Sequence, residues 1–345
     1  MPSYDAFLLV SFGGPEGPDD VMPFLENVTR GRGVPRQRLE HVAEHYYRFG
    51  GVSPINQECR NLLAAVEKDF AASDVDLPVY WGNRNWDPLL ADTVAAMAAD
   101  GRRHAIAFAT SAYSSYSGCR QYLEDIERAR EAVPGAPRID KLRPFFNHPG
   151  FVEPLADAAR SAAESLRSGV QDDYDLVFTA HSIPEAMSRA SGPSGNAYPT
   201  QLAEASRLVA ERLGRAGSWR LVYQSRSGPP SVPWLVPDLD DCLKDLAGSG
   251  SKGVVLVPVG FVSDHMEVVF DLDIEAAETA ERLGLPLARA ATPGTDPRFI
   301  AMITELVAER LDGRPPRALG SMGPALSTCG SGCCGAVATR PRTEP

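Results

Sequence analysis

The stretch GVVLVPVGFVSDHMEVVFDLDIE, residues 253–275, contains the signals that decide the fold of this chain. Its first part, GVVLVPV, is an apolar, β-branched run of the kind found in a buried strand. The part that follows has the spacing of a helix with carboxylates on one face. These carboxylates stand at spacings of four, four and three, as Glu267, Asp271, Glu275 and Glu278. A helix that leaves the edge of a buried sheet therefore carries a line of acidic side chains.

The same alternation of strand and helix runs along the whole chain. Short apolar runs are separated by amphipathic segments rich in Ala, Leu, Glu and Arg. The apolar runs are DAFLLVSF (5–12), VYWGN (79–83), HAIAFAT (104–110), YDLVFTAHS (174–182), WRLVYQS (219–225) and GVVLVPVGF (253–261). This pattern predicts an α/β protein with parallel sheets. Ligands of such sheets bind outside the carboxyl ends of the strands, where His181 and the acidic helix both lie.

An internal repeat divides the chain in two. At a shift of 148 residues, the block that begins at Ala105 lies over the block that begins at Gly253, and Pro149 lies over Pro297. Few identities support the match, so chance is the open alternative. The matching strand and helix phases favour two similar Rossmann-like halves, each a parallel sheet flanked by helices, with a cleft between them. Cys119 then occupies in the first half the position that Glu267 occupies in the second.

We place the first half at residues 1–150, the second at residues 151–315 and a Cys-rich tail at residues 316–345. The distance from the first strand to the repeated block is about twenty residues longer in the first half than in the second. We assign the extra length to residues 27–51, where basic and aromatic side chains gather between Gly-containing turns. One interpretation is a surface loop and helix. The other is a lip over a flat, aromatic, anionic ligand, because Arg and Tyr bind carboxylates while rings pack on the ligand plane.

Composition and charge narrow the classes of function. The chain has 345 residues, of which 43% are hydrophobic and 23% charged, which is typical of a globular protein with room for two cores. The formal net charge of -11 argues against a nucleic-acid surface and favours cations as ligands. The longest apolar runs are about half the roughly 20 residues of a membrane helix. The first residues lack the pattern of a signal peptide, so we expect a cytoplasmic protein.

The tail STCGSGCCG brings three cysteines together, Cys329, Cys333 and Cys334. Thiols stay reduced in the cytoplasm, so this cluster indicates a metal site that takes a fourth ligand from the folded body. Cys119 is the best anchor, because it stands at the predicted start of a helix, where the helix dipole favours a thiolate. Four thiolates suit either structural zinc or a 2Fe-2S cluster, so the residues alone leave both open.

The other two cysteines, Cys59 and Cys242, lie in segments with the pattern of amphipathic helices, NQECRNLLAAVEKDF and PDLDDCLKDLAG. We expect them to be ordinary buried thiols.

His181 and Glu267 are the candidates for chemistry at the predicted cleft. A histidine at a strand end is often only a satisfied structural group, yet its neutral form binds ferrous iron and accepts protons near neutral pH. Glu267 stands three residues after Asp264, and the alternative to a site is a capping box at the helix start. The alternative for the other acids is a solvated helix face. If the line faces the cleft, it offers carboxylates to a divalent cation or to protons.

Five segments together resemble the ferrochelatases, the enzymes that insert ferrous iron into a porphyrin. They occur in the order of that family and cover nearly the whole chain. The segments are SFGGPE (11–16), GGVSPIN (50–56), TAHSIPE (179–185), YQSRSGPPSVPWLVPD (223–238) and VPVGFVSDHMEVVFDLDIE (257–275). The combination of TAHSIP with GFVSDHxE is highly specific, whereas SFGGP alone is a weak signal.

The resemblance implies roles for individual residues. His181 and Glu267 match the family's metal-site pair, which is also its catalytic pair. Ser53 matches a porphyrin-contacting serine, and Tyr122 matches a tyrosine that binds the edge of the macrocycle. Many bacterial relatives have a tyrosine at the position of Phe12, which can pack on the porphyrin but cannot ligate iron. The line Asp271, Glu275 and Glu278 would deliver iron or relay protons.

The Cys-rich tail with Cys119 is similar to the actinobacterial branch of the family, whose members carry a 2Fe-2S cluster. This resemblance implies a [2Fe-2S] cluster on Cys119, Cys329, Cys333 and Cys334, coproporphyrin III and Fe²⁺ as substrates, and Fe-coproporphyrin III (coproheme) as product. It also suggests a monomer that hands its product to a coproheme decarboxylase. Protoporphyrin IX as substrate and a non-catalytic tetrapyrrole or iron carrier are the alternatives.

Two further classes fit less well. A zinc-binding structural protein would explain the tail but not His181 and Glu267. The cobalt and nickel chelatases of smaller tetrapyrroles usually have paired histidines at the metal site, which this chain lacks.

Overall fold

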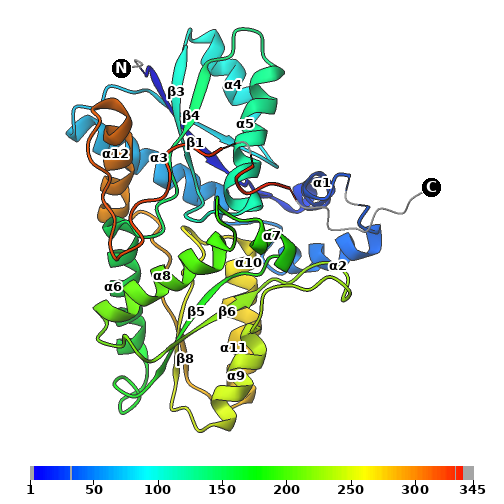
Figure 1. Cartoon of the computed structure of the whole chain (residues 1–345). Helices are drawn as coiled ribbons and strands as arrows, with labels where there is room; N and C mark the ends of the chain where they lie inside the picture. The colour runs from blue at the N-terminus through cyan, green and yellow to red at the C-terminus, as the bar shows by residue number, and fades with distance from the viewer. Residues whose placement is uncertain (1–3, 32, 331, 337–345) are drawn as a thin grey trace.

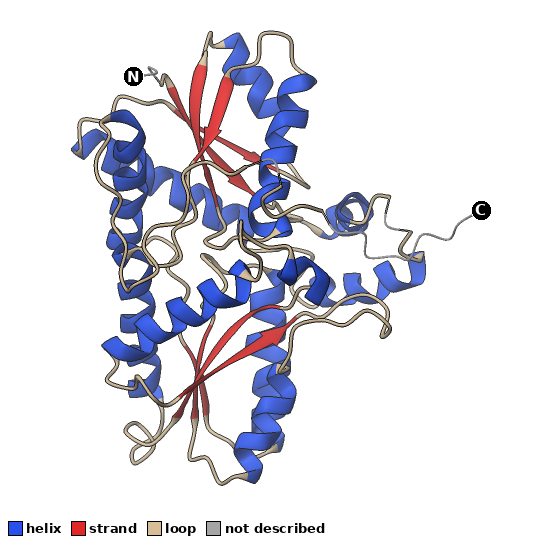
Figure 2. Cartoon of the chain, in the orientation of Figure 1, coloured by secondary structure: helices blue, strands red, loops and turns tan. Residues whose placement is uncertain are grey.

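The structure is a computed structural model that describes residues 4–31, 33–330 and 332–336. It contains two four-stranded parallel sheets, one in each half of the chain, with helices packed around them (Figure 1, Figure 2). The strands of the first sheet are β1 (Ala6–Ser11), β2 (Val79–Asn83), β3 (His104–Ala109) and β4 (Arg138–Lys141). Those of the second are β5 (Asp175–His181), β6 (Trp219–Gln224), β7 (Val254–Val257) and β8 (Leu287–Arg289).

Both sheets have the same strand order. The first sheet runs β2-β1-β3-β4 and the second β6-β5-β7-β8. The central strands β1, β3 and β7 are fully buried along their length, and β5 is buried except at its two ends, so apolar residues occupy both faces of each strand. The predicted α/β class and the predicted repeat of two similar halves are therefore confirmed.

The helices of the first half follow its strands in a regular series. They are α1 (Pro18–Val28), α2 (Arg36–Tyr47), α3 (Ile55–Ala72), α4 (Leu90–Ala99), the π-helix η1 (Tyr116–Arg120) and α5 (Gln121–Glu131). The first residues of β1 and β2 are 73 positions apart, whereas those of β5 and β6 are 44 apart. The extra length of the first half thus lies between β1 and β2, where α2 falls within residues 27–51.

The second half also alternates strands with helices, and its first helix precedes its first strand. Its helices are α6 (Pro149–Ser165), α7 (Glu185–Arg189), α8 (Ala197–Arg212), α9 (Leu239–Gly248), α10 (Met266–Val268), the π-helix η2 (Val269–Ala276), α11 (Ala277–Arg282) and α12 (Pro297–Leu311). The starts of α6 and α12 are 148 residues apart, the same shift as the sequence repeat, and both have Pro at the first helical position. Each half also places a π-helix after its third strand.

One hydrophobic core joins the two halves. It contains Phe108 of β3 and Phe178 of β5, together with Phe151 of α6 and Phe299 of α12. The helices α6 and α12 meet closely, because a side chain at Gly150 would place its Cβ 2.4 Å from the carbonyl oxygen of Arg298. A cleft between halves that share a core is held rigidly.

No helix among the described residues is both long enough and apolar enough to cross a membrane. Cys59 in α3 and Cys242 in α9 are buried, as predicted.

Candidate active site

His181 is the last residue of β5, and its surroundings fix the ring. Its backbone carbonyl accepts a hydrogen bond of 2.8 Å from the hydroxyl of Tyr198. Its ring Nδ1 is hydrogen-bonded to the carbonyl oxygen of Ser182. Because a carbonyl only accepts, Nδ1 carries a proton, and Nε2 is left to face the second half's acidic helix. The opposite nitrogen is therefore the one available for chemistry.

Glu267 lies opposite this nitrogen, in the short helix α10 that follows β7. Its Oε2 is 3.5 Å from His181 Nε2, and the side chains are 49% and 33% exposed, respectively. Desolvation opposes charge on both groups, but their mutual attraction outweighs it. The Glu267 carboxylate raises the pKa of His181 to about 9, and the His181 ring lowers the pKa of Glu267 to about 2. At neutral pH the pair is ionised, with a proton on His181.

The capping-box alternative for Glu267 is wrong. The N-cap of α10 is His265, which makes no side-chain cap bond. The carboxylate of Asp264 instead accepts hydrogen bonds of 2.9 Å from Arg289 and from the hydroxyl of Thr292. Glu267 is therefore free of a capping role and remains half-exposed beside His181.

The acidic line continues from Glu267 along η2. Asp271 is half-buried, and burial followed by the neighbouring carboxylate of Glu267 raises its pKa to about 7. Glu275 is more exposed, and partial desolvation followed by the nearby carboxylate of Glu278 raises its pKa as well. A π-helix has more residues per turn than the 3.6 of an α-helix, so side chains four apart drift less around its axis. The π-turn thus keeps the carboxylates in line.

The helix α2 of the first half reaches this line from the other side. The ring of His45 stacks on Phe270 of η2, with centroids 3.7 Å apart and planes within 12°. The guanidinium of Arg48 lies 5.9 Å from the centroid of the same ring. Burial and then the carboxylate of Glu267 raise the pKa of Tyr46. The helix α2 therefore packs against η2, and Tyr46 is a site residue that the sequence pattern did not single out.

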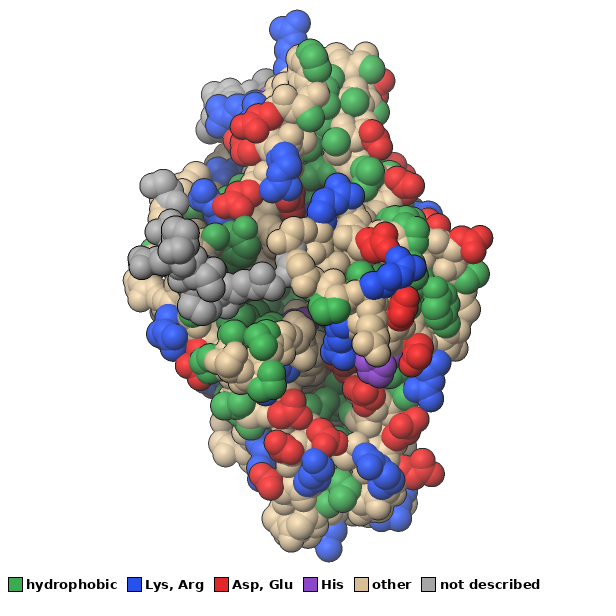
Figure 3. Space-filling model, turned by 90° about the vertical axis from the view of Figure 1, so that its right-hand side faces the viewer, with side chains coloured by type: hydrophobic (Ala, Val, Ile, Leu, Met, Phe, Trp, Pro, Cys, Tyr) green, Lys and Arg blue, Asp and Glu red, His purple; other side chains and the backbone are tan. Residues whose placement is uncertain are grey.

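The surface of the molecule is hollowed between the two halves (Figure 3). In the side view, hydrophobic side chains lie in this hollow and acidic side chains gather below it (Figure 3). Comparison with known protein families identifies the chain that carries this His–Glu pair and acidic helix. The family model described as Ferrochelatase matches residues 4–311. The chain belongs to the ferrochelatase family.

Curated relatives agree with the ferrochelatase assignment over the full chain. A coproporphyrin III ferrochelatase of Nocardia farcinica is 58% identical over 339 residues, which cover 96% of each chain. One of Streptomyces coelicolor is 54% identical over 356 residues, covering 98% of this chain and 95% of its own. The expectation of an enzyme that inserts metal into porphyrin is confirmed at the level of the family.

Two solved structures share the fold of this ferrochelatase. SirB from Bacillus subtilis with Fe³⁺ has a TM-score of 0.55 at 12% identity, over 90% of this chain and 98% of its own. DR2241 from Deinococcus radiodurans has a TM-score of 0.52 at 16% identity, over 91% of this chain and 56% of its own. At these identities the likeness concerns the two-domain architecture only.

The residues expected to bind porphyrin differ in exposure. Phe12 follows β1 and is 37% exposed, so it can meet a ligand in the cleft. Tyr122 is buried in α5, and Ser53 is buried against Gly14, where an added Cβ would lie 2.8 Å from the Ser53 Cβ. The guanidinium of Arg84 lies 5.8 Å from the ring centroid of Phe12 and 4.6 Å from that of Tyr122. The guanidinium of Arg84 therefore lies against both aromatic rings.

The cysteines of the tail gather near Cys119 in η1. The Sγ atoms of Cys333 and Cys334 are 3.9 Å apart, and the backbone N–H of Gly192 donates a 3.1 Å hydrogen bond to Cys334. We expected Cys119 to be a thiolate, and this is wrong for the protein without bound metal. Contact with the Cys329 sulfur and burial raise the pKa of Cys119, so its thiol keeps the proton. In residues 4–31, 33–330 and 332–336, no three His, Cys, Asp or Glu side chains are arranged to hold a single ion.

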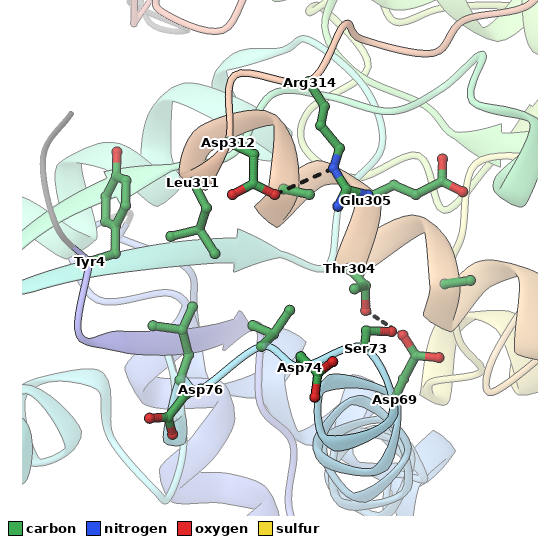
Figure 4. A pocket seen from close by; sticks show the side chains of 14 residues that line it. Tyr4, Asp69, Ser73, Asp74, Asp76, Thr304, Glu305, Leu311, Asp312 and Arg314 are labelled. Atoms are coloured by element: carbon green, nitrogen blue, oxygen red, sulfur yellow. Dashed lines mark hydrogen bonds and ion pairs between the residues drawn. The ribbon is translucent and has the colours of Figure 1, made fainter.

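A separate cavity of about 390 Å³ lies between the end of α3 and α12 (Figure 4). Five of its 14 lining residues carry carboxylates, and the hydroxyl of Thr304 donates to one of them, Asp69. The cavity contains none of the residues predicted from the sequence. It is not part of the cleft that holds His181 and Glu267.

Proposed function

We propose that this ferrochelatase inserts ferrous iron into coproporphyrin III and releases Fe-coproporphyrin III (coproheme), as a step of heme biosynthesis. The observation that carries the proposal is the 3.5 Å approach of His181 Nε2 to Glu267 Oε2 at the carboxyl ends of two strands. The names of the actinobacterial relatives support the choice of porphyrin.

The pair and its neighbours suit the chemistry of metal insertion. The macrocycle must bend so that its nitrogen lone pairs are accessible, its pyrrole protons must leave, and iron must shed water. A rigid cleft can impose the bend, with binding of the rest of the ring offsetting about 1 to 5 kcal/mol of strain. His181 accepts a pyrrole proton once its own proton has gone. Glu267 and Asp271 offer oxygen ligands to the incoming cation.

The lip formed by residues 27–51 supports a porphyrin rich in carboxylates. Coproporphyrin III has more propionate side chains than protoporphyrin IX and needs more cationic partners. Arg30 and Arg48 are exposed on this segment, and neither has an ion-pair partner within the part of the chain that the structure describes. Each is available to a propionate.

The test is anaerobic incubation of the protein with Fe²⁺ and either coproporphyrin III or protoporphyrin IX, followed by the absorption spectrum of the metalated ring. We expect faster turnover of coproporphyrin III. Equal or faster turnover of protoporphyrin IX would overturn the substrate assignment. Binding of porphyrin without metalation would instead support a carrier.

For the tail we propose a [2Fe-2S] cluster on Cys119, Cys329, Cys333 and Cys334. The support is that all four sulfurs lie in one region and that a backbone N–H already donates to Cys334. Such hydrogen bonds tune the sulfur ligands of iron–sulfur centres. A binuclear cluster spreads its ligands over two irons, which suits thiols that do not converge on one point. When bound, the cluster supplies a redox-sensitive link between the tail and η1.

We further propose that the chain works as a monomer in the cytoplasm, where thiols remain reduced. Its product still carries all its propionates. We therefore propose hand-over of the product to a coproheme decarboxylase.

A further inference from the structure

Gln224, the last residue of β6, joins the two sides of the active site. It pairs with His181 in the register of the sheet. Its side chain is 3% exposed, and its amide oxygen accepts a 2.6 Å hydrogen bond from the hydroxyl of Thr179. Its amide nitrogen donates to Asp271 Oδ2 at 3.2 Å and to the backbone oxygen of Glu267 at 3.5 Å. The geometry of Asp271 is therefore tied to the strand next to His181.

Ser225 follows Gln224 in an unusual backbone conformation. Its φ is +58°, in the left-handed region that a serine seldom adopts. This turn brings its hydroxyl to Asp271, where it donates to Oδ2. Both donors thus bind the same oxygen, and among the described residues no hydrogen bond reaches the other oxygen, Oδ1. A carboxylate held by one oxygen keeps the other aimed in a fixed direction.

We propose that Gln224 and Ser225 are positioning residues that hold Asp271 Oδ2, so that Oδ1 is presented to the cation on its way to Glu267 and His181. The inference rests on the proposed function, in which this site receives ferrous iron. A hard divalent cation gains most from oxygen ligands fixed in place before it arrives, because the site then pays no ordering entropy on binding. A carboxylate free to turn would bind the same cation more weakly.

A purely structural role is the alternative, in which the two residues only fasten η2 to β6. The variant Ser225→Gly separates the two roles. It removes the hydroxyl, but glycine adopts the left-handed region without strain, so the fold is kept or made more stable. Asp74→Gly is the matched control, since Asp74 also has a positive φ, of +54°, and lies outside the active site.

We expect Ser225→Gly to raise the KM for Fe²⁺ about tenfold, the lower end of the effect of losing a hydrogen bond to a charged group. The KM for porphyrin and the Tm should stay unchanged, or the Tm should rise. Asp74→Gly should change neither KM. Ser225→Asn should restore much of the loss, because Asn tolerates this backbone conformation and its amide can donate to Oδ2.

A second measurement needs no turnover. Calorimetric titration of the porphyrin-free full chain with Co²⁺ should give a Kd that is larger by a similar factor in Ser225→Gly and unchanged in Asp74→Gly. An unchanged Kd together with an unchanged iron KM, or a loss of affinity matched by a fall in Tm, would overturn the inference. If the wild-type chain inserts no iron, the proposed function fails, and the Co²⁺ titration alone then decides whether Gln224 and Ser225 position Asp271 for a cation.

Discussion

Glu267 Oε2 lies 3.5 Å from His181 Nε2 because β5 and β7 are neighbours in a parallel sheet. His181 ends β5, and Glu267 stands in the first turn of the helix after β7. Parallel neighbours end at the same edge of the sheet, so two residues 86 positions apart in sequence become one site. The pair is thus a direct consequence of strand order.

The first prediction concerns this pair. His181→Ala and Glu267→Gln should each lower the rate of iron insertion at least about 100-fold, the scale of losing a positioned proton acceptor. Both side chains are partly exposed, so the fold should persist. The measurement is anaerobic insertion kinetics together with thermal unfolding.

A matched control is available nearby. Glu281→Gln in α11 changes an exposed side chain of the same type as Glu267 and should insert iron at the wild-type rate. Near-normal turnover in either His181→Ala or Glu267→Gln would mean that this residue is not needed for iron insertion and that the proposed mechanism is wrong.

The second prediction is that insertion speeds up with pH. The pKa of His181 is about 9, so its neutral, proton-accepting form is scarce at neutral pH. The rate at limiting metal should rise by up to about tenfold per pH unit between about pH 6 and pH 8. Co²⁺ or Zn²⁺ can replace iron to avoid oxidation. A rate that stays flat across this range would show that His181 is not the acceptor.

The third prediction links the same pair to stability. The pKa of His181 is raised from 6.5 to about 9, so its contribution is complete below pH 6.5 and is lost as pH rises through 9. The pKa of Glu267 is lowered from 4.5 to about 2, so its contribution is present above pH 4.5 and is lost as pH falls through 2. The Tm difference between wild type and Glu267→Gln should be widest between pH 4.5 and 6.5. A difference that does not shrink above pH 9 would contradict this assignment of charges.

Much of the fold could be predicted from the sequence, because buried parallel strands leave a strong local signal. The runs around Phe108 and Phe178 are apolar on both faces, and the prolines at 149 and 297 start equivalent helices. These features depend on residues close together in the chain. The shared core that fuses the halves depends on contacts between distant segments, and no local pattern announces it.

The site was predicted less completely. The chemical types of His181 and Glu267 and their positions at strand ends sufficed to pair them. Tyr46 was hidden in a basic, aromatic segment, because only the packing of α2 on η2 brings it to Glu267. Ser225 lies in the motif YQSRSGPPSVPWLVPD, but its role depends on a backbone conformation that cannot be read from composition.

The fourth prediction concerns the acidic line. Asp271→Asn should raise the KM for Fe²⁺ at least about tenfold, because the half-buried charge that Gln224 and Ser225 hold is itself lost. Glu275→Gln should have a smaller effect and Glu278→Gln the smallest, since solvent screens exposed charges. Steady-state kinetics at limiting and saturating iron will separate them. If the dependence of the rate on iron is unchanged in all three variants, the acidic line has no part in iron delivery and is an ordinary solvated helix face.

The last prediction concerns the tail. If the proposed [2Fe-2S] cluster forms, protein purified without oxygen should be reddish-brown and contain about two irons and two sulfides per chain. Cys119→Ser should lose colour, iron and sulfide together, because Cys119 is the one proposed ligand from the folded body. Metal and sulfide analysis with absorption spectroscopy will measure this.

Cys59→Ser and Cys242→Ser are the controls for this change. Both thiols are buried in helices, as Cys119 is buried in η1, so the three variants impose a comparable loss of packing. Of these three cysteines, Cys119 is the one that lies beside the Cys329 sulfur, so its loss should release the cluster and the loss of Cys59 or Cys242 should not. Colourless protein with one zinc per chain would refute the cluster. Colour retained in Cys119→Ser would show that another residue anchors the tail, because three tail thiols alone leave one iron position without its ligand.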